Sequence, residues 1–204
     1  MRILDPKETH RALAHQRWHA SPMPMISFTK TFDISHLLRL QRRKGYKLYP
    51  LMMYCIGMAA KDIREFYYIA FPDKLVEYDK IAVQGIIADG TGDFYFCDVP
   101  LVEDINTFMS TYTSQVATIK ETHDNVFHPD HVLIGTSCIN TLEFDSCCNQ
   151  YVPEYTNPFL CWGKYRKGWF RTTLPITIQV NHQQMDGGHV ALFLNRLQEI
   201  FNTI

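Results

Sequence analysis

The chain has 204 residues, of which 46% are hydrophobic, and its 20 Lys and Arg nearly balance its 21 Asp and Glu, for a formal net charge of −1. These values predict a single globular domain, residues 1–204, with a sizeable core. The balanced charge excludes a broad electrostatic footprint for nucleic acid or an anionic membrane. The longest apolar run, residues 51–60, has about half of the ~20 residues needed to cross a bilayer. We therefore expect neither nucleic acid nor a membrane as a partner.

The amino terminus and the cysteines indicate a cytoplasmic protein. Charged residues, among them Asp5, Lys7 and Arg11, interrupt the place where the apolar segment of a signal peptide would lie. The six cysteines are Cys55, Cys97, Cys138, Cys147, Cys148 and Cys161. They stand mostly in apolar surroundings without the CxxC spacing of zinc sites, so we expect reduced, buried thiols. Their even number is also compatible with disulfides.

Turn residues and hydrophobic periodicity predict a mixed α/β chain. The predicted elements, in chain order, are a helix over residues 6–19, a strand over 25–32, a helix from near Ile34, a helix over 51–62, strands over 75–77, 81–87 and 94–99, a helix over 102–122, a strand over 132–142, a strand over 174–180 and a helix over 189–201. Pro50 suits the first turn of its helix, and residues 89–92 read as a turn. No repeat or linker divides the chain.

The last two elements deliver His182 to a loop between a strand and a helix. An imidazole titrates near neutrality and can take a proton from a hydroxyl group, so His182 is the candidate base. Asp186 follows four residues later, close enough across the turn to organise the site, and Gly187 and Gly188 ease the turn. By spacing alone, the same pattern fits a surface histidine before an Asp-Gly turn.

The full segment LPITIQVNHQQMDGGHV at residues 174–190, followed by LNRLQ, resembles the carboxy-terminal signature of chloramphenicol acetyltransferases. Further matches recur in order over nearly the whole chain: HR at 10–11, GYKLYP at 45–50, FDS at 144–146 and GKY at 163–165. The resemblance implies an α/β (α+β) two-layer sandwich with a mixed β-sheet, and a homotrimer whose active sites lie at subunit interfaces. It also implies acetyl-CoA as co-substrate and a small-molecule hydroxyl acceptor.

The resemblance assigns the catalytic roles residue by residue. It places the general base on His182 and the serine that donates a hydrogen bond to the tetrahedral oxyanion on Ser146. It makes Asp186 and Arg11 a buried pair that supports the catalytic loop. Apart from the resemblance, Arg11 would be a solvated helix residue and Ser146 a turn cap.

For the cofactor, the resemblance places Lys47 and Lys164 near the phosphates of coenzyme A, and Tyr49 and Tyr165 beside its adenine. Ammonium groups neutralise phosphate, and a tyrosine ring offers a face for stacking. Taken singly, an exposed lysine or a half-buried tyrosine is more commonly without a ligand.

His182, Asp186 and His189 also carry the donor atoms of a zinc site. Because the resemblance explains these residues without a metal, we expect none, and we expect His189 to help the following helix start.

Several positions depart from the family pattern. Asn181 replaces a second histidine, Gly188 an aromatic residue, and Cys161 a threonine associated with the transition state. Arg17-Trp18 falls where the family presents aromatic residues to the acceptor, so Trp18 is the candidate acceptor-pocket residue and Arg17 adds a charge. Besides a chloramphenicol O-acetyltransferase, the sequence therefore permits an acyltransferase for another hydroxylated acceptor, or a catalytically weak CoA-binding or interaction protein.

Overall fold

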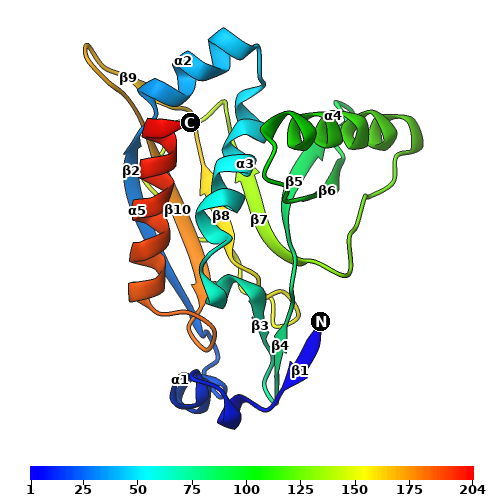
Figure 1. The fold of residues 1–204 in the computed structure, drawn as a ribbon, viewed down its shortest axis with the longest axis vertical. Helices are drawn as coiled ribbons and strands as arrows, with labels where there is room; N and C mark the ends of the chain where they lie inside the picture. The colour runs from blue at the N-terminus through cyan, green and yellow to red at the C-terminus, as the bar shows by residue number, and fades with distance from the viewer.

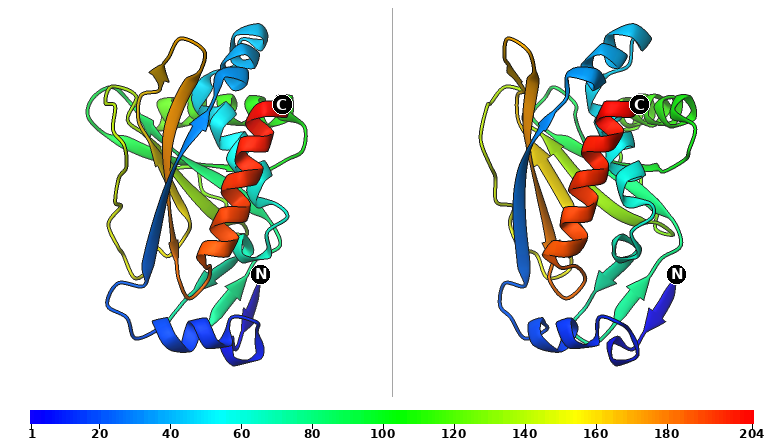
Figure 2. Two further views of the ribbon diagram at one scale, coloured as in Figure 1. Left: turned by 90° about the vertical axis from the view of Figure 1, so that its left-hand side faces the viewer. Right: turned by 60° about the vertical axis from the view of Figure 1, so that its left-hand side comes forward.

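The computed structural model describes all 204 residues and has two layers, a mixed β-sheet and a set of helices packed on one of its faces (Figures 1 and 2). The predicted two-layer α/β fold with a mixed sheet is thus confirmed. The sheet has the order β2-β10-β8-β7-β5-β6, with β9 pairing to β10; β5, β7 and β8 run parallel, and the other neighbours run antiparallel. Its strands are β2 (Met25–Asp33), β5 (Ile81–Ala88), β6 (Phe94–Pro100), β7 (Val132–Cys138), β8 (Phe159–Trp162), β9 (Arg166–Lys167) and β10 (Thr172–Asn181).

Four helices build the second layer: α2 (Ser35–Lys44), α3 (Leu48–Ala60), α4 (Ile105–Thr122) and α5 (Gly187–Thr203). α3 packs against α5, α4 and β5, and is therefore buried on almost every side. It begins three residues before the predicted start, because Pro50 occupies its first turn, where an amide N–H has no partner within the helix. None of the helices combines the length and apolar character that crossing a bilayer requires.

A second, three-stranded antiparallel sheet lies below the main one in Figure 1, in the order β1-β4-β3. It consists of β1 (Arg2–Leu4), β3 (Tyr68–Ala70) and β4 (Leu75–Glu77), with the short helices η1 (Pro6–Glu8), α1 (Ala12–Trp18) and η2 (Arg64–Tyr67) nearby in the chain. The predicted continuous helix over residues 6–19 is wrong. The Thr9 hydroxyl donates to the Pro6 carbonyl and accepts from the Arg11 amide, and these local bonds replace helical ones.

The chain leaves the sheet at Cys138, earlier than predicted, and residues 139–158 cross the face opposite the helices (Figure 2). Two hydrogen bonds tie this connection to β10: Cys147 N donates to Thr177 Oγ1 at 3.2 Å, and Asn149 N donates to Gln179 Oε1 at 3.1 Å. Because side chains alternate along a strand, β10 buries Ile176, Ile178 and Val180 under the helices and turns its polar residues to the connection.

The close approach of the connection to β8 requires a glycine. A Cβ at Gly163 would lie 2.4 Å from the Leu142 carbonyl oxygen and 2.8 Å from the Phe144 ring. We expect Gly163→Ala to lower the free energy of unfolding by about 1–3 kcal/mol, measured by urea denaturation. Gly188→Ala is the matched control, because nothing lies within 4 Å of its added Cβ. Equal stability of the two variants would contradict the packing described.

Candidate active site

The turn after β10 is held by its own backbone and by Asn181. The Asn181 side chain is fully buried and its Oδ1 accepts from Gln183 N at 2.8 Å, while its carbonyl accepts from Gln184 N and Met185 N. His182 N donates to the Pro24 carbonyl at 2.7 Å. The departure at Asn181 therefore has a structural role, since its amide closes the turn that presents His182.

Arg11 and Asp186 meet beneath this turn. The guanidinium group donates to both carboxylate oxygens of Asp186, at 2.7 and 2.9 Å, and to the carbonyl oxygens of His182 at 3.1 Å and Gln183 at 3.3 Å. The Arg11 side chain is 5% exposed and that of Asp186 is 43% exposed. The guanidinium lowers the pKa of the Asp186 carboxyl by hydrogen bonding and by its charge. One arginine thus binds the turn at four atoms.

His182 is half-buried, and its two ring nitrogens differ. Nδ1 is buried, has no hydrogen-bond partner, and lies 3.4 Å from Asp186 Oδ1. Nε2 is not among the buried unpartnered atoms, so it is the nitrogen that reaches solvent. The indole of Trp18 stacks on the imidazole, with ring centroids 4.6 Å apart and planes 14° apart. The ring can therefore exchange a proton at Nε2 while Trp18 and Asp186 limit its movement.

Sequence analysis missed a buried carboxylate behind the turn. Glu65, in η2, accepts from His10 Nε2 at 2.9 Å and lies 3.3 Å from His189 Nε2. His189 Nδ1 in turn accepts from Asp186 N at 3.1 Å and completes a capping box at the start of α5, which confirms its predicted role in starting that helix. The available signal was a lone acidic residue followed by the apolar run of residues 66–71.

Ser146 does not meet His182 within the chain. It lies exposed in the connection, one residue before the contact between Cys147 and Thr177. Since Thr177 precedes His182 by five residues of nearly straight strand, the serine lies roughly 16 Å from the histidine along β10. Cys161 pairs with Thr177 in register, and burial raises the pKa of its thiol to about 12.

The four candidate cofactor residues have different surroundings. Lys47 is exposed before α3, and Lys164 and Tyr165 line a hollow of about 720 Å³ together with Arg166 and Lys167. Lys164, Arg166 and Lys167 bring positive charge to the hollow, and Glu143, which also lines it, pairs with Arg166.

Tyr49 lies deeper than an adenine-flanking aromatic would. Its hydroxyl accepts from Ile86 N at 3.0 Å and bonds to Thr136, and burial raises its pKa to about 12. The ring packs against Tyr112 and Trp162. Because the hydroxyl is used inside the sheet, only the ring is left for any ligand.

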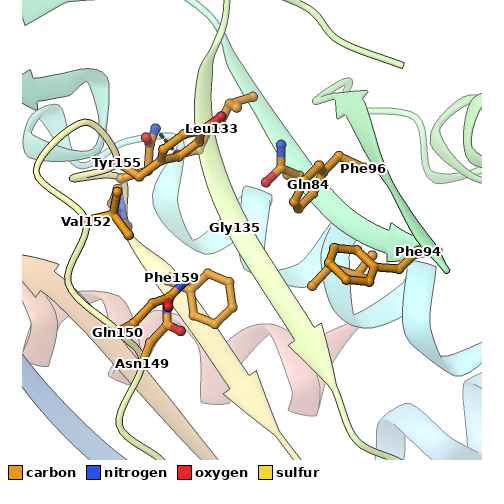
Figure 3. A pocket seen from close by; sticks show the side chains of 13 residues that line it. Gln84, Phe94, Phe96, Leu133, Gly135, Asn149, Gln150, Val152, Tyr155 and Phe159 are labelled. Atoms are coloured by element: carbon orange, nitrogen blue, oxygen red, sulfur yellow. Dashed lines mark hydrogen bonds between the residues drawn. The ribbon is translucent and has the colours of Figure 1, made fainter. Parts of the chain in front are cut away.

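A cavity of about 470 Å³ opens on the sheet face that the helices leave free (Figure 3). Phe94 and Phe96 lie on one side of β7, and Tyr155 and Phe159 on the other (Figure 3). Amide side chains, among them Gln84, add polar groups to this largely aromatic lining. Sequence analysis missed the cavity because four separate segments build it. Trp18, the predicted acceptor-pocket residue, does not line it in the single chain.

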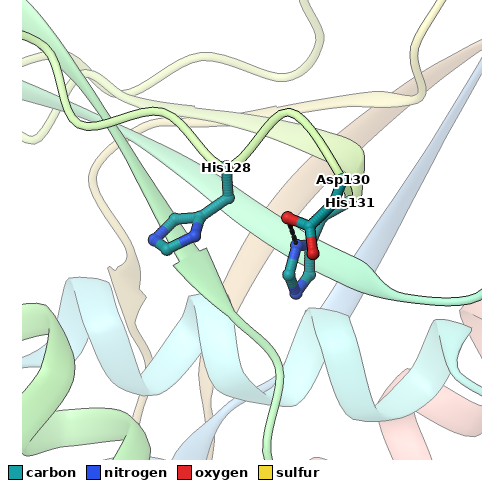
Figure 4. Close-up of side chains that lie close together, drawn as sticks. All are labelled: His128, Asp130 and His131. Atoms are coloured by element: carbon teal, nitrogen blue, oxygen red, sulfur yellow. Dashed lines mark hydrogen bonds and ion pairs between the residues drawn. The ribbon is translucent and has the colours of Figure 1, made fainter.

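A group of metal-binding residue types lies elsewhere, before β7: His128, Asp130 and His131 (Figure 4). The Asp130 carboxylate bonds to His131 Nδ1 at 2.7 Å and to Lys80 at 3.2 Å. Hydrogen bonds from His131 and Lys80 lower the pKa of Asp130 to about 2. These bonds account for the position of Asp130 in the cluster.

The fold is that of the acyltransferases. The structure of dihydrolipoamide acetyltransferase from Azotobacter vinelandii is similar with a TM-score of 0.70 at 14% identity, covering 94% of this chain and 86% of that one. A solved chloramphenicol acetyltransferase is similar with a TM-score of 0.80 at 22% identity, covering 98% of this chain and 99% of that one.

Sequence comparison is more specific than the fold. The family model for chloramphenicol acetyltransferase matches residues 3–198. Chloramphenicol acetyltransferase 3 of Escherichia coli is 32% identical over 186 residues, 87% of this chain and 86% of that protein. The chain therefore belongs to the chloramphenicol acetyltransferase family, and it is an acyltransferase enzyme.

The ion pair beneath the turn predicts a pH-dependent stability. Asp186→Asn should lower the free energy of unfolding by about 1–2 kcal/mol near pH 7, less than for a fully buried pair because Asp186 is 43% exposed. The pKa of Asp186 is lowered on folding, so its contribution is complete above the ordinary value of 3.8 and is lost as the pH falls through the lowered pKa. The unfolding curves of wild type and variant should converge below pH 3.8.

The matched control is Asp145→Asn, which removes one of the two carboxylate partners of Arg166, at a side chain 90% exposed. We expect no measurable change there, since water solvates both groups. A difference between wild type and Asp186→Asn that persists unchanged in acid would count against the ion pair.

Proposed function

We propose that the chain is an acetyl-CoA-dependent O-acetyltransferase for a small hydroxylated acceptor, with chloramphenicol as the first candidate and residues 1–204 acting as one domain. The observation that carries the proposal is the exposed Nε2 of His182, on a ring held by Trp18 and by the turn that Arg11 binds. A histidine so placed can act as a general base at neutral pH.

In the proposed reaction, His182 Nε2 removes the proton of the acceptor hydroxyl as its oxygen attacks the thioester carbonyl of acetyl-CoA. The Ser146 hydroxyl donates a hydrogen bond to the resulting oxyanion. The intermediate then collapses to the acetyl ester, and the departing thiolate takes the proton from His182, so no acyl-enzyme forms. Asp186, 3.4 Å from Nδ1, favours the transient imidazolium by its charge. In the dihydrolipoamide acetyltransferase of Azotobacter vinelandii, a serine, a histidine and an asparagine have a role in the catalytic mechanism.

We further propose a homotrimer in which His182 of one copy faces the cavity of the next. Two observations support this arrangement. Ser146 and His182 are too far apart in one chain to act on one carbonyl. The rim of the cavity also exposes large apolar side chains, 59% of Phe94 and 63% of Tyr155, of a kind that interfaces commonly cover.

For coenzyme A we propose Lys164 and Tyr165 as the main contacts, with Lys47 and the Tyr49 ring as further contacts. The cationic hollow beside Tyr165 supports phosphate binding.

All six cysteines are free thiols, which supports the cytoplasm as the compartment.

The acceptor is less constrained than the reaction. An aromatic cavity with amide groups suits an aromatic molecule with polar substituents, as the names of the relatives suggest. Arg17, exposed beside Trp18, favours a second candidate, an acceptor that carries negative charge. Asn181 and Gly188 no longer argue for a different acceptor, because the first closes the turn and the second contacts nothing at its Cβ position.

Acyl transfer is tested by following the free thiol of coenzyme A with acetyl-CoA and a panel of hydroxyl compounds that includes chloramphenicol. We expect turnover of chloramphenicol, and His182→Ala should lower kcat by about 10²–10⁴-fold with little change in KM. His131→Ala, a histidine remote from the turn, should match wild type. Turnover of another compound alone would select a different acceptor. If wild type turns over no compound of the panel, the remaining hypothesis is a catalytically weak CoA-binding or interaction protein.

Shared sites predict complementation between two inactive variants. His182→Ala and Ser146→Ala should each be weakly active alone, yet trimers mixed from equal amounts should regain about a quarter of wild-type activity. That fraction follows because each interface needs an intact histidine from one copy and an intact serine from its neighbour. Activity is measured after co-expression or joint refolding, against each variant refolded alone. No recovery on mixing would rule out shared sites.

A further inference from the structure

Glu65 joins three segments that surround the candidate base. Glu65 is 8% exposed, so its carboxylate has little contact with water. Oε1 lies 2.9 Å from His10 Nε2 and 3.3 Å from His189 Nε2, and the Glu65 carbonyl accepts from Gln184 Nε2 at 3.1 Å. The segment before α1, the turn after β10 and the first turn of α5 thus all bind one residue.

Two contacts favour the same tautomer of His189, one with Asp186 and one with Glu65. Asp186 N is a donor, so His189 Nδ1, at 3.1 Å, must be the acceptor and carry no proton. The neutral ring then holds its proton on Nε2, the nitrogen that faces Glu65. A carboxylate at this place favours that tautomer over the alternative, in which Nδ1–H would oppose the Asp186 N–H.

A continuous chain of contacts runs from Glu65 to His182. Glu65 Oε1 lies 3.3 Å from His189 Nε2, and His189 Nδ1 accepts the N–H of Asp186. The Asp186 carboxylate binds Arg11 and stands 3.4 Å from His182 Nδ1. Asp186 therefore receives its position both from Arg11 and from the tautomer that Glu65 selects.

We propose that Glu65 is a positioning residue for the general base, acting through the tautomer of His189 and the place of Asp186. This inference rests on the proposed function. It predicts that loss of Glu65 disturbs the orientation of His182, and so the proton transfer, while substrate binding is kept.

The test compares Glu65→Ala and Glu65→Gln with wild type in steady-state kinetics. Glu65→Ala should lower kcat about tenfold with KM for both substrates unchanged. Glu65→Gln keeps an oxygen for His189 and should recover part of the loss. His10→Gln is the matched control, because His10 binds the same oxygen but does not contact Asp186, and it should leave kcat unchanged.

Two substitutions at His189 separate the two ends of the contact. Asn places an oxygen where Nδ1 lies and keeps the acceptor for Asp186 N, whereas Gln places its amide nearer Nε2 and keeps the contact to Glu65. If Glu65 acts through His189, adding Glu65→Ala to His189→Asn should cause no further fall in kcat. Additive losses, an equal loss in His10→Gln, or unchanged kcat in Glu65→Ala would overturn the proposal.

Imidazole ¹⁵N chemical shifts give a readout that does not depend on activity. Wild type should show His189 protonated at Nε2, and Glu65→Ala should show mixed tautomers. If the His189 signals do not change, the inference fails whether or not acetyl is transferred. If the His189 signals change but the protein acetylates no hydroxyl compound, the tautomer inference stands and the proposed function is wrong. Thermal unfolding of each variant shows whether the fold is kept.

Discussion

The ion pair of Arg11 with Asp186 is the contact on which the site depends. A guanidinium group that is 5% exposed has lost its water and must find a partner for each donor inside the protein. Four of the five N–H donors of Arg11 find partners in one carboxylate and two carbonyl groups of a single turn, 171–175 residues further along the chain. The turn cannot move without leaving charge unpaired. Its rigidity is what allows His182 to stand with one nitrogen exposed.

The second constraint is that different parts of the chain pack on the two faces of the sheet. The helices pack on one face, whereas the connection over residues 139–158 crosses the other (Figure 2). Buried amide groups of Gln179 and Asn181 on this side have no acceptor for their NH₂ groups within the chain, a cost that proteins seldom leave unmet. The rim of the cavity, in contrast, exposes large apolar side chains, 59% of Phe94 and 63% of Tyr155. Exposed apolar surface of this kind is commonly covered by a partner.

The elements with strong periodicity could be predicted from the sequence almost to the residue. β10 and α5 differ from their predicted ranges by about two residues at each end, because a long buried strand and an apolar stripe of Val190, Leu194 and Leu197 are unambiguous patterns. Of the five strands with two to four residues, only β4 was predicted, over its full range of residues 75–77. β1, β3, β8 and β9 were missed, because so few residues show no clear period. The prediction of a continuous helix over residues 6–19 was wrong for another reason. The Thr9 hydroxyl forms local hydrogen bonds with Pro6 and Arg11 that replace helical ones.

The sequence by itself determined the fold class, the family and the residue types of the turn, because motif matches and hydrophobic patterns are local in the chain. Only the tertiary structure decided that Glu65 lies against His189, and that the Tyr49 hydroxyl is hydrogen-bonded inside the sheet. It also decided that Ser146 lies far from His182 in one chain. These facts depend on where distant segments meet and on which polar atoms find partners there. Contacts between distant segments produce no periodicity or spacing in the sequence. A glutamate has the same letter whether its carboxylate is buried or exposed.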